Sequence, residues 1–196
     1  MRAQFVDIDG VSTRFLAAGS GDPVLLLHGF GMLADGWSPN LPALAERHSV
    51  CAPDLLGCGF TAPGRRNGAP PQVAMAAHLA KPIDRLKIDT CAQLTSFALP
   101  WAWDAYEDHL LGLIESLDKT EAWAWGRLGT IEVPALLLYG RSDPRGKPEW
   151  EEQAAREIPS ARCIGFDAGG HFVNLEHTER VNALLREFLD GTRRTA

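Results

Sequence analysis

The sequence predicts an α/β fold in which a mostly parallel sheet carries helices on both faces. One observation is a pair of continuously apolar runs, at 24–27 (VLLL) and 135–139 (ALLLY), which are typical of strands covered on both sides. The other is a helical spacing of apolar residues, clearest at 179–189, in segments that alternate with the strands. Such alternation of strands and helices is the pattern of a parallel sheet.

The chain is expected to open with a β-hairpin. Residues 4–8 and 13–17 have the short, alternating pattern of strands, and Asp9-Gly10 lies between them. This dipeptide readily adopts the positive φ angles of a tight hairpin turn. The hairpin therefore precedes the first apolar run.

A β-α-β unit is expected next. The strand at 24–27 is followed by apolar residues at helical spacing over 37–47 and by a short buried strand at 49–53. Further along, the pattern predicts strands and helices in alternation. The strands are 135–139 and 161–166, and the helices are 73–86, 103–117, 149–157 and 179–189.

Length and composition predict one globular domain over residues 1–196. Of these residues, 45% are hydrophobic and 22% are charged, the balance of a folded chain. The net charge of −6 gives no electrostatic reason to expect nucleic acid or an anionic membrane as a partner. No apolar run approaches the roughly 20 residues that a membrane span needs.

The cysteines and glycines argue against metal and cofactor sites. Four cysteines are scattered without a C-x-x-C pair, which excludes the usual zinc and redox motifs; they are Cys51, Cys58, Cys91 and Cys163. No G-x-G-x-x-G motif follows a predicted strand, so no dinucleotide cofactor is expected. The scattered thiols fit a reducing compartment, and the first ten residues lack the apolar run of a secretory signal. Both observations favour a cytoplasmic location.

Polar residues that directly follow the predicted strands are the candidate site. His28 and Gly29 follow the strand at 24–27, Asp143 follows 135–139, and His171 lies in a glycine-rich turn after 161–166. In an open parallel sheet, the loops at the carboxyl ends of the strands form the site. Each residue alone also fits a structural role, such as a turn donor or a helix cap.

Four segments, taken together and in order, resemble the α/β-hydrolase superfamily. They are 24–31 (VLLLHGFG), 52–61 (APDLLGCGFT), 133–144 (VPALLLYGRSDP) and 170–176 (GHFVNLE). The second segment is most similar to the branch that holds serine esterases, lactonases and hydrolases of carbon–carbon bonds. The resemblance implies a reduced α/β-hydrolase fold without a cofactor or metal.

The resemblance also implies roles for the candidate residues. His171 would exchange a proton with a nucleophile and a leaving group, and Asp143 would orient its ring. The backbone N–H groups of Phe30 and Gly29 would form the oxyanion hole, with His28 as a structural support. Asp54 is expected to cap a turn. Two interpretations stay open for Glu176: a pair with a nearby basic residue, or the start of the last helix.

The nucleophile elbow of the family, G-x-S-x-G, is absent from the sequence. Ser96 is the only serine near the expected place, and Leu94 stands where the strained turn needs a small residue. Only 38 residues separate Leu94 from Val133, too few for a capped family member. Either a block has been lost near Leu94, or the protein is a minimal hydrolase in which Ser96 is the nucleophile, 103–117 is the helix after it and 121–125 is the next strand. Residues 100–130 would then be a remnant of a lid or a helix–strand segment.

Two functions follow from these observations. The first is a cofactor-independent hydrolase that acts on a small ester-like molecule through an acyl-enzyme, with lactones and activated carbon–carbon bonds as other substrate classes. The second is a non-catalytic, degenerate homologue that serves as a binding module or is a truncated variant. The sequence leaves the oligomeric state open.

Overall fold

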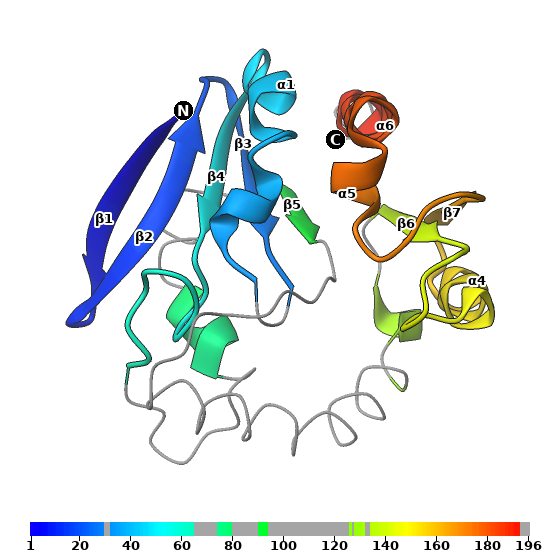
Figure 1. Cartoon of the computed structure of the whole chain (residues 1–196), viewed down its shortest axis with the longest axis horizontal. Coiled ribbons are helices and arrows are strands. Elements are labelled where there is room, and N and C mark those ends of the chain that lie inside the picture. Colours follow the sequence, from blue (N-terminus) through cyan, green and yellow to red (C-terminus); the bar gives the residue numbers. More distant parts are fainter. Residues whose placement is uncertain are drawn as a thin grey trace. The chain divides into compact units, whose positions relative to one another are not determined.

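The computed structural model describes residues 1–29, 32–64, 74–79, 90–93, 126, 128–131 and 134–192. The chain divides into two compact units, Met1–Leu117 and Asp118–Ala196, and each is described by itself (Figure 1). The prediction that 1–196 form one domain stays a prediction. Among the described residues, no helix has both the length and the apolar character to cross a membrane.

The first unit holds a five-stranded mixed sheet with the order β1-β2-β4-β3-β5. Its strands are β1 (Arg2–Ile8), β2 (Val11–Ala18), β3 (Asp22–Leu27), β4 (His48–Pro53) and β5 (Thr90–Gln93). β1 and β4 pair with β2 in antiparallel orientation, whereas β3 pairs in parallel with both β4 and β5. The predicted hairpin and β-α-β strands are therefore confirmed.

A two-residue turn closes the hairpin, as predicted. Asp9 and Gly10 have φ angles of 53° and 81°, and Ile8 pairs with Val11 across the turn. Positive φ at both central residues gives the backbone twist that matches two antiparallel strands. The Asp7 carboxylate accepts the N–H of Gly10 at 3.0 Å and secures the turn.

The apolar run of β3 lies at the centre of the first unit's core. Val24, Leu25 and Leu26 are at most 2% exposed. Parallel neighbours on both edges and cover on both faces explain why this strand lacks the polar alternation of a half-exposed one. The loop at its carboxyl end, which begins at His28, is thereby fixed to the sheet.

The helix predicted for 37–47 is wrong in its bounds. A 3₁₀ turn, η1 (Ala34–Trp37), comes first, and a five-residue helix, α1 (Leu41–Ala45), follows it. Pro39 and Pro42 explain the interruption. Proline lacks a backbone N–H and is tolerated only in the first turn of a helix, so the helix begins just before Pro42.

The second unit pairs two parallel strands and surrounds them with helices. The strands are β6 (Ala135–Gly140) and β7 (Ala161–Phe166), and the helices are η2 (Leu128–Thr130), α4 (Pro148–Glu157), α5 (Val173–Glu176) and α6 (Thr178–Thr192). These bounds confirm the predicted strands 135–139 and 161–166 and the helices 149–157 and 179–189. Three of the five pairings among the described strands are parallel.

Helices cover both faces of the β6–β7 pair, as predicted. The Cys163 thiol donates to the Glu151 carbonyl of α4 at 3.8 Å. Phe166, an odd number of residues further along β7, lies on the opposite face, where the Arg180 guanidinium of α6 stacks over its ring at 4.5 Å. Figure 1 shows α4 and α6 on either side of these strands.

The middle of the sequence is described only in part. Residues 74–79 are helical, within the helix predicted for 73–86. The predicted helix 103–117, the strand considered at 121–125 and most of the possible lid remnant at 100–130 lie outside the described residues.

Gly10 and Gly19 both have positive φ, but only at Gly19 would an added side chain also collide with the backbone. We expect Gly10→Ala to lower the free energy of unfolding by about 1 kcal/mol, because a Cβ there meets open space and only the backbone conformation is strained. Gly19→Ala should cost about 3 kcal/mol or more, since its Cβ would fall on the carbonyl oxygens of Ala45 and His48. Urea unfolding of both variants tests this, and equal losses would contradict it.

Candidate active site

Asp143 lies in the tight turn that follows β6. Its N–H donates to the carbonyl of Gly140, the last residue of the strand, at 3.3 Å. Its Oδ1 atom accepts the N–H of Arg145 at 2.8 Å. This contact between a side chain and the backbone two residues on is typical of Asp in turns. The other oxygen, Oδ2, remains directed to a different partner.

His171 lies in the glycine-rich loop between β7 and α5, and this loop is bound to the Asp143 turn. The Arg141 N–H donates to the Phe166 carbonyl at 3.0 Å, and the Ser142 N–H donates to the Gly169 carbonyl at 2.9 Å. A side chain at Gly140 would collide with the Gly169 and Gly170 carbonyls, so the loops meet only because that residue is glycine.

The two candidate side chains meet directly. The His171 Nδ1 atom lies 2.7 Å from Asp143 Oδ2, and the side chains are 12% and 14% exposed. An ionised carboxylate only accepts hydrogen bonds, so the proton of the neutral ring lies on Nδ1. Nε2 then carries the lone pair and is the ring nitrogen that Asp143 does not engage. This is the arrangement of a proton acceptor with a fixed tautomer.

The environment keeps Asp143 charged. Burial raises the pKa of a carboxyl group, but here the hydrogen bonds from His171 and from the N–H groups of Arg145 and Gly146 outweigh it. The pKa of Asp143 therefore lies below its ordinary value of 3.8. Near neutral pH, the carboxylate remains ionised beside the imidazole.

In the first unit, both ring nitrogens of His28 make hydrogen bonds with backbone groups. Nδ1 donates to the Gly29 carbonyl at 2.8 Å, and Nε2 accepts the Leu55 N–H at 2.9 Å. The ring is 2% exposed, and its burial lowers the pKa of His28, which keeps it neutral. These contacts join the loop after β3 to the loop after β4, in keeping with the structural role expected for His28.

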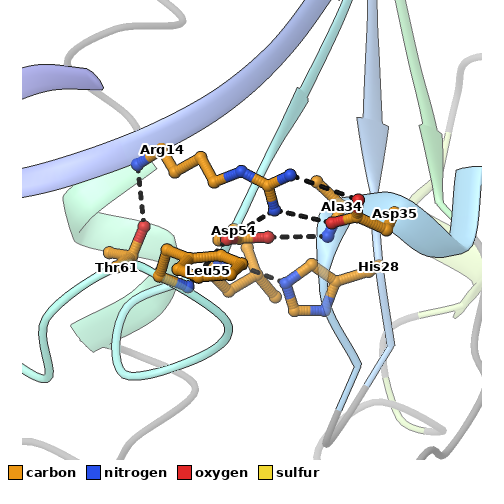
Figure 2. Close-up of polar contacts among 8 residues, drawn as sticks. Arg14, His28, Ala34, Asp35, Asp54, Leu55 and Thr61 are labelled. Carbon is orange, nitrogen blue, oxygen red and sulfur yellow. Dashed lines mark hydrogen bonds and ion pairs between the residues drawn. The ribbon is translucent and has the colours of Figure 1, made fainter. Parts of the chain in front are cut away.

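Asp54 organises the same two loops from the interior (Figure 2). Its side chain is fully buried. Oδ1 accepts the Ala34 N–H at 2.7 Å, and Oδ2 accepts the Phe60 N–H at 2.8 Å. The predicted turn cap is thus present, and the carboxylate also reaches the segment after His28.

Arg14 of β2 balances the buried charge, a contact that the sequence analysis missed. Its Nη1 atom lies 3.3 Å from Asp54 and 2.6 Å from Asp35, and Nη2 donates to Asp35 at 3.2 Å. The hydrogen bond to Asp35 raises the pKa of Arg14 against the opposing effect of burial, and Asp54 adds to the rise. The partners of Arg14 are 21 and 40 residues away, and no sequence pattern relates an arginine in a strand to carboxylates at such distances.

The remaining candidate residues are either outside the described residues or make few described contacts. Ser96 and Phe30 are outside the described residues, so neither is placed. Gly29 is buried, and its carbonyl accepts the N–H of Met32 at 3.3 Å. Burial raises the pKa of Cys51 and of Cys58 to about 12, so these thiols stay protonated near neutral pH.

Glu176 was predicted either to pair with a basic residue or to begin the last helix. The second interpretation is wrong, because Glu176 ends α5 and α6 begins at Thr178. Its carboxylate instead accepts the N–H groups of Gly170 and Phe172. Its place in the segment 170–176 was known from the sequence, but no spacing rule indicated these two backbone contacts.

Two protein-family models match the chain. Residues 22–94 match the family described as "alpha/beta hydrolase fold", and residues 116–195 match the family described as "TAP-like protein". The two matches together cover most of the chain, and residues 95–115 lie between them. The first contains the His28 loop and the Asp54 turn, and the second contains Asp143 and His171.

Sequence relatives differ in how much of their length is matched. The chain is 47% identical over 62 residues to 2-hydroxy-6-oxo-6-(2'-aminophenyl)hexa-2,4-dienoic acid hydrolase of Metapseudomonas resinovorans, which is 30% of this chain and 21% of that enzyme. It is 27% identical over 207 residues to ABHD14B of Pongo abelii, which carries the name of a protein-lysine deacylase. That match covers 97% of this chain and 96% of the relative.

Solved structures share the fold. A meta-cleavage product hydrolase from Pseudomonas fluorescens IP01 superposes with a TM-score of 0.74 at 20% identity, covering 96% of this chain and 97% of that one. The enol-lactonase from Burkholderia xenovorans LB400 superposes with a TM-score of 0.73 at 17% identity, covering 95% of this chain and 100% of that one. At this identity the similarity establishes the fold.

The two aspartates that contact Arg14 should differ in their effect on stability. Asp54→Asn should lower the free energy of unfolding by about 3 kcal/mol, because it breaks a buried ion pair and turns an amide donor toward backbone N–H groups. Asp35→Asn should cost about 1 kcal/mol or less, since its side chain is 47% exposed. Denaturant unfolding of the two variants measures the difference, and a larger loss for the Asp35 variant would contradict the analysis.

The lowered pKa of Asp143 links stability to acid pH. Its folded-state pKa lies below the unfolded value, so its contribution is fully present above about pH 4 and is lost as the pH falls through the folded-state pKa. Unfolding free energies of the wild type and Asp143→Asn, measured from pH 7 to pH 2.5, should converge toward the acid end. Curves that stay parallel over the whole range would refute the linkage.

Proposed function

Because the chain belongs to the α/β-hydrolase superfamily, we propose that it is a cofactor-independent hydrolase of carboxylic esters, with lactones and activated carbon–carbon bonds as further substrate classes. The contact between His171 Nδ1 and Asp143 Oδ2 at 2.7 Å carries this proposal. A histidine with a fixed tautomer and an ionised partner is suited to accept a proton from a nucleophile and return it to a leaving group.

The proposed reaction passes through an acyl-enzyme. The hydroxyl of Ser96 attacks the substrate carbonyl while Nε2 of His171 takes its proton, and Asp143 stabilises the imidazolium that forms. The backbone N–H groups of Phe30 and Gly29 would receive the negative oxygen. His171 then protonates the leaving alcohol, and a water molecule hydrolyses the acyl-enzyme by the same route.

The sequence relatives and the charge of the chain support this class of substrate. One relative is named as a hydrolase of a dienoic acid, and another carries the name of a deacylase. A net charge of −6 favours a small-molecule substrate over nucleic acid. Free thiols at Cys51, Cys58 and Cys163 fit a reducing cytoplasmic setting, which we include in the proposal.

A second function is a non-catalytic homologue that acts as a binding module or is a truncated variant. The observation that favours it is the absence of a G-x-S-x-G elbow from the sequence. Loss of a central strand would leave unpaired sheet edges, so this alternative predicts self-association. A monodisperse monomer that melts cooperatively, shown by sedimentation and calorimetry, would count against it.

Labelling with a fluorophosphonate separates the two functions. If Ser96 is the activated nucleophile, the reagent should form an adduct on Ser96 that peptide mass spectrometry locates. His171→Ala should lower the labelling rate and the ester turnover by at least about 1,000-fold, because the hydroxyl then lacks its base. His78→Ala, which removes a histidine bonded to Thr13 at 2.8 Å, is the matched control and should retain labelling.

The outcomes of the labelling experiment discriminate clearly. An adduct that persists at the wild-type rate in His171→Ala would refute the role of His171. Folded wild-type protein without an adduct and without ester turnover would instead favour the non-catalytic homologue. Circular dichroism of each variant verifies that the fold is intact.

A further inference from the structure

A single carboxylate holds the backbone on both sides of His171. Glu176, at the end of α5, accepts the Gly170 N–H with Oε2 and the Phe172 N–H with Oε1, the latter at 3.0 Å. In return, the Glu176 N–H donates to the Phe172 carbonyl at 2.9 Å. The loop from 170 to 172 is therefore closed against the first turn of α5.

This closure resembles a helix cap that has been extended by two residues. In an ordinary capping box, an acidic side chain in the first turn accepts the N–H of the residue that precedes the helix. Phe172 precedes α5 and provides that N–H, but its own side chain makes no cap hydrogen bond. The second oxygen reaches back beyond His171 to Gly170, so the histidine lies between the two bonded peptide groups.

The closure also acts on the imidazole through a neighbour. The Phe172 ring meets the His171 ring edge-on, with centroids 5.1 Å apart. Because Glu176 anchors the Phe172 N–H, it fixes the base of a side chain that packs directly on the imidazole. On its other side the ring is bonded to Asp143. The hydrogen bond to Asp143 and the edge-on contact with Phe172 both restrict the rotation of the ring.

The Glu176 carboxylate lies where a side chain at residue 170 would begin. A Cβ at this position would lie 2.9 Å from Oε1 and 3.1 Å from Oε2 of Glu176. An alanine there would push the carboxylate away while leaving its charge in place. We therefore expect an alanine at residue 170 to disturb the hydrogen bonds that the two N–H groups donate to the carboxylate.

From these contacts we propose that Glu176 is a positioning residue for His171: its carboxylate fixes the peptide groups at 170 and 172 and so holds the imidazole in line with Asp143. This inference rests on the proposed function for its consequence in catalysis. The two N–H donors bind different oxygens of the carboxylate. Glutamine offers one acceptor and one donor, so it would leave one N–H facing an amide group.

The test compares Glu176→Gln with the matched control Glu179→Gln, which makes the same change in the first turn of α6. In ¹⁵N-histidine NMR, wild type and control should show His171 as one Nδ1–H tautomer with a downfield proton shared with Asp143. Glu176→Gln should show averaged tautomers and loss of that proton signal. On an ester substrate, kcat should fall about 10- to 100-fold while KM changes less than about twofold.

Gly170→Ala is the second variant, and it displaces the carboxylate without removing it. It should reproduce the NMR change of Glu176→Gln, and it decides the question if the glutamine variant does not fold. The proposal is overturned if the variants melt at lower temperature but keep the wild-type His171 signals. If wild type turns over no ester, the proposed function fails, whereas the NMR comparison still decides the role of Glu176.

Discussion

The parallel register of β6 and β7 is the constraint on which the candidate site depends. Asp143 and His171 lie 28 residues apart in the sequence, and they meet because both strands end at the same edge. The register pairs Gly140 with Phe166. A slip of one residue would displace one loop by about 3.3 Å along the strand. A hydrogen bond of 2.7 Å between His171 and Asp143 would not survive such a displacement. Strand pairing therefore determines the geometry of the Asp143–His171 dyad.

Carboxylates that accept backbone N–H groups hold the loops in both units. Loops beyond the end of a sheet have N–H groups that no neighbouring strand can bind, and a partly buried N–H needs an acceptor. Asp54 supplies two such bonds in the first unit, and Asp143 and Glu176 each do so in the second. Bonds to an ionised acceptor are stronger than neutral ones, so a few side chains suffice to order glycine-rich segments.

The sequence predicted the strands and the dyad far better than the contacts that support them. Buried strands have a local signal, the apolar run, and Asp143 and His171 lie in the loops that follow two predicted strands, within segments that resemble the hydrolase family. By contrast, Arg14 meets Asp54 forty residues away, and Glu176 reaches its partners through a loop without periodicity. The Arg14 contact depends on how distant segments approach one another. The Glu176 contacts are only four and six residues long, but they depend on the course of an irregular loop, and no pattern of spacing records either feature. The helix predicted for 37–47 failed for a local reason, because helical spacing was given more weight than its prolines.

Stability alone does not account for the pairing of Asp143 with His171. Burial raises the pKa of Asp143, and the hydrogen bonds from His171, Arg145 and Gly146 more than offset that effect. Partial burial of a carboxylate costs free energy that its hydrogen bonds must offset, so a fold has little need of this arrangement for its own sake. A ring with a fixed tautomer and a charged partner gains its advantage where a proton is transferred. The physical cost of the dyad therefore favours the hydrolase over the binding module.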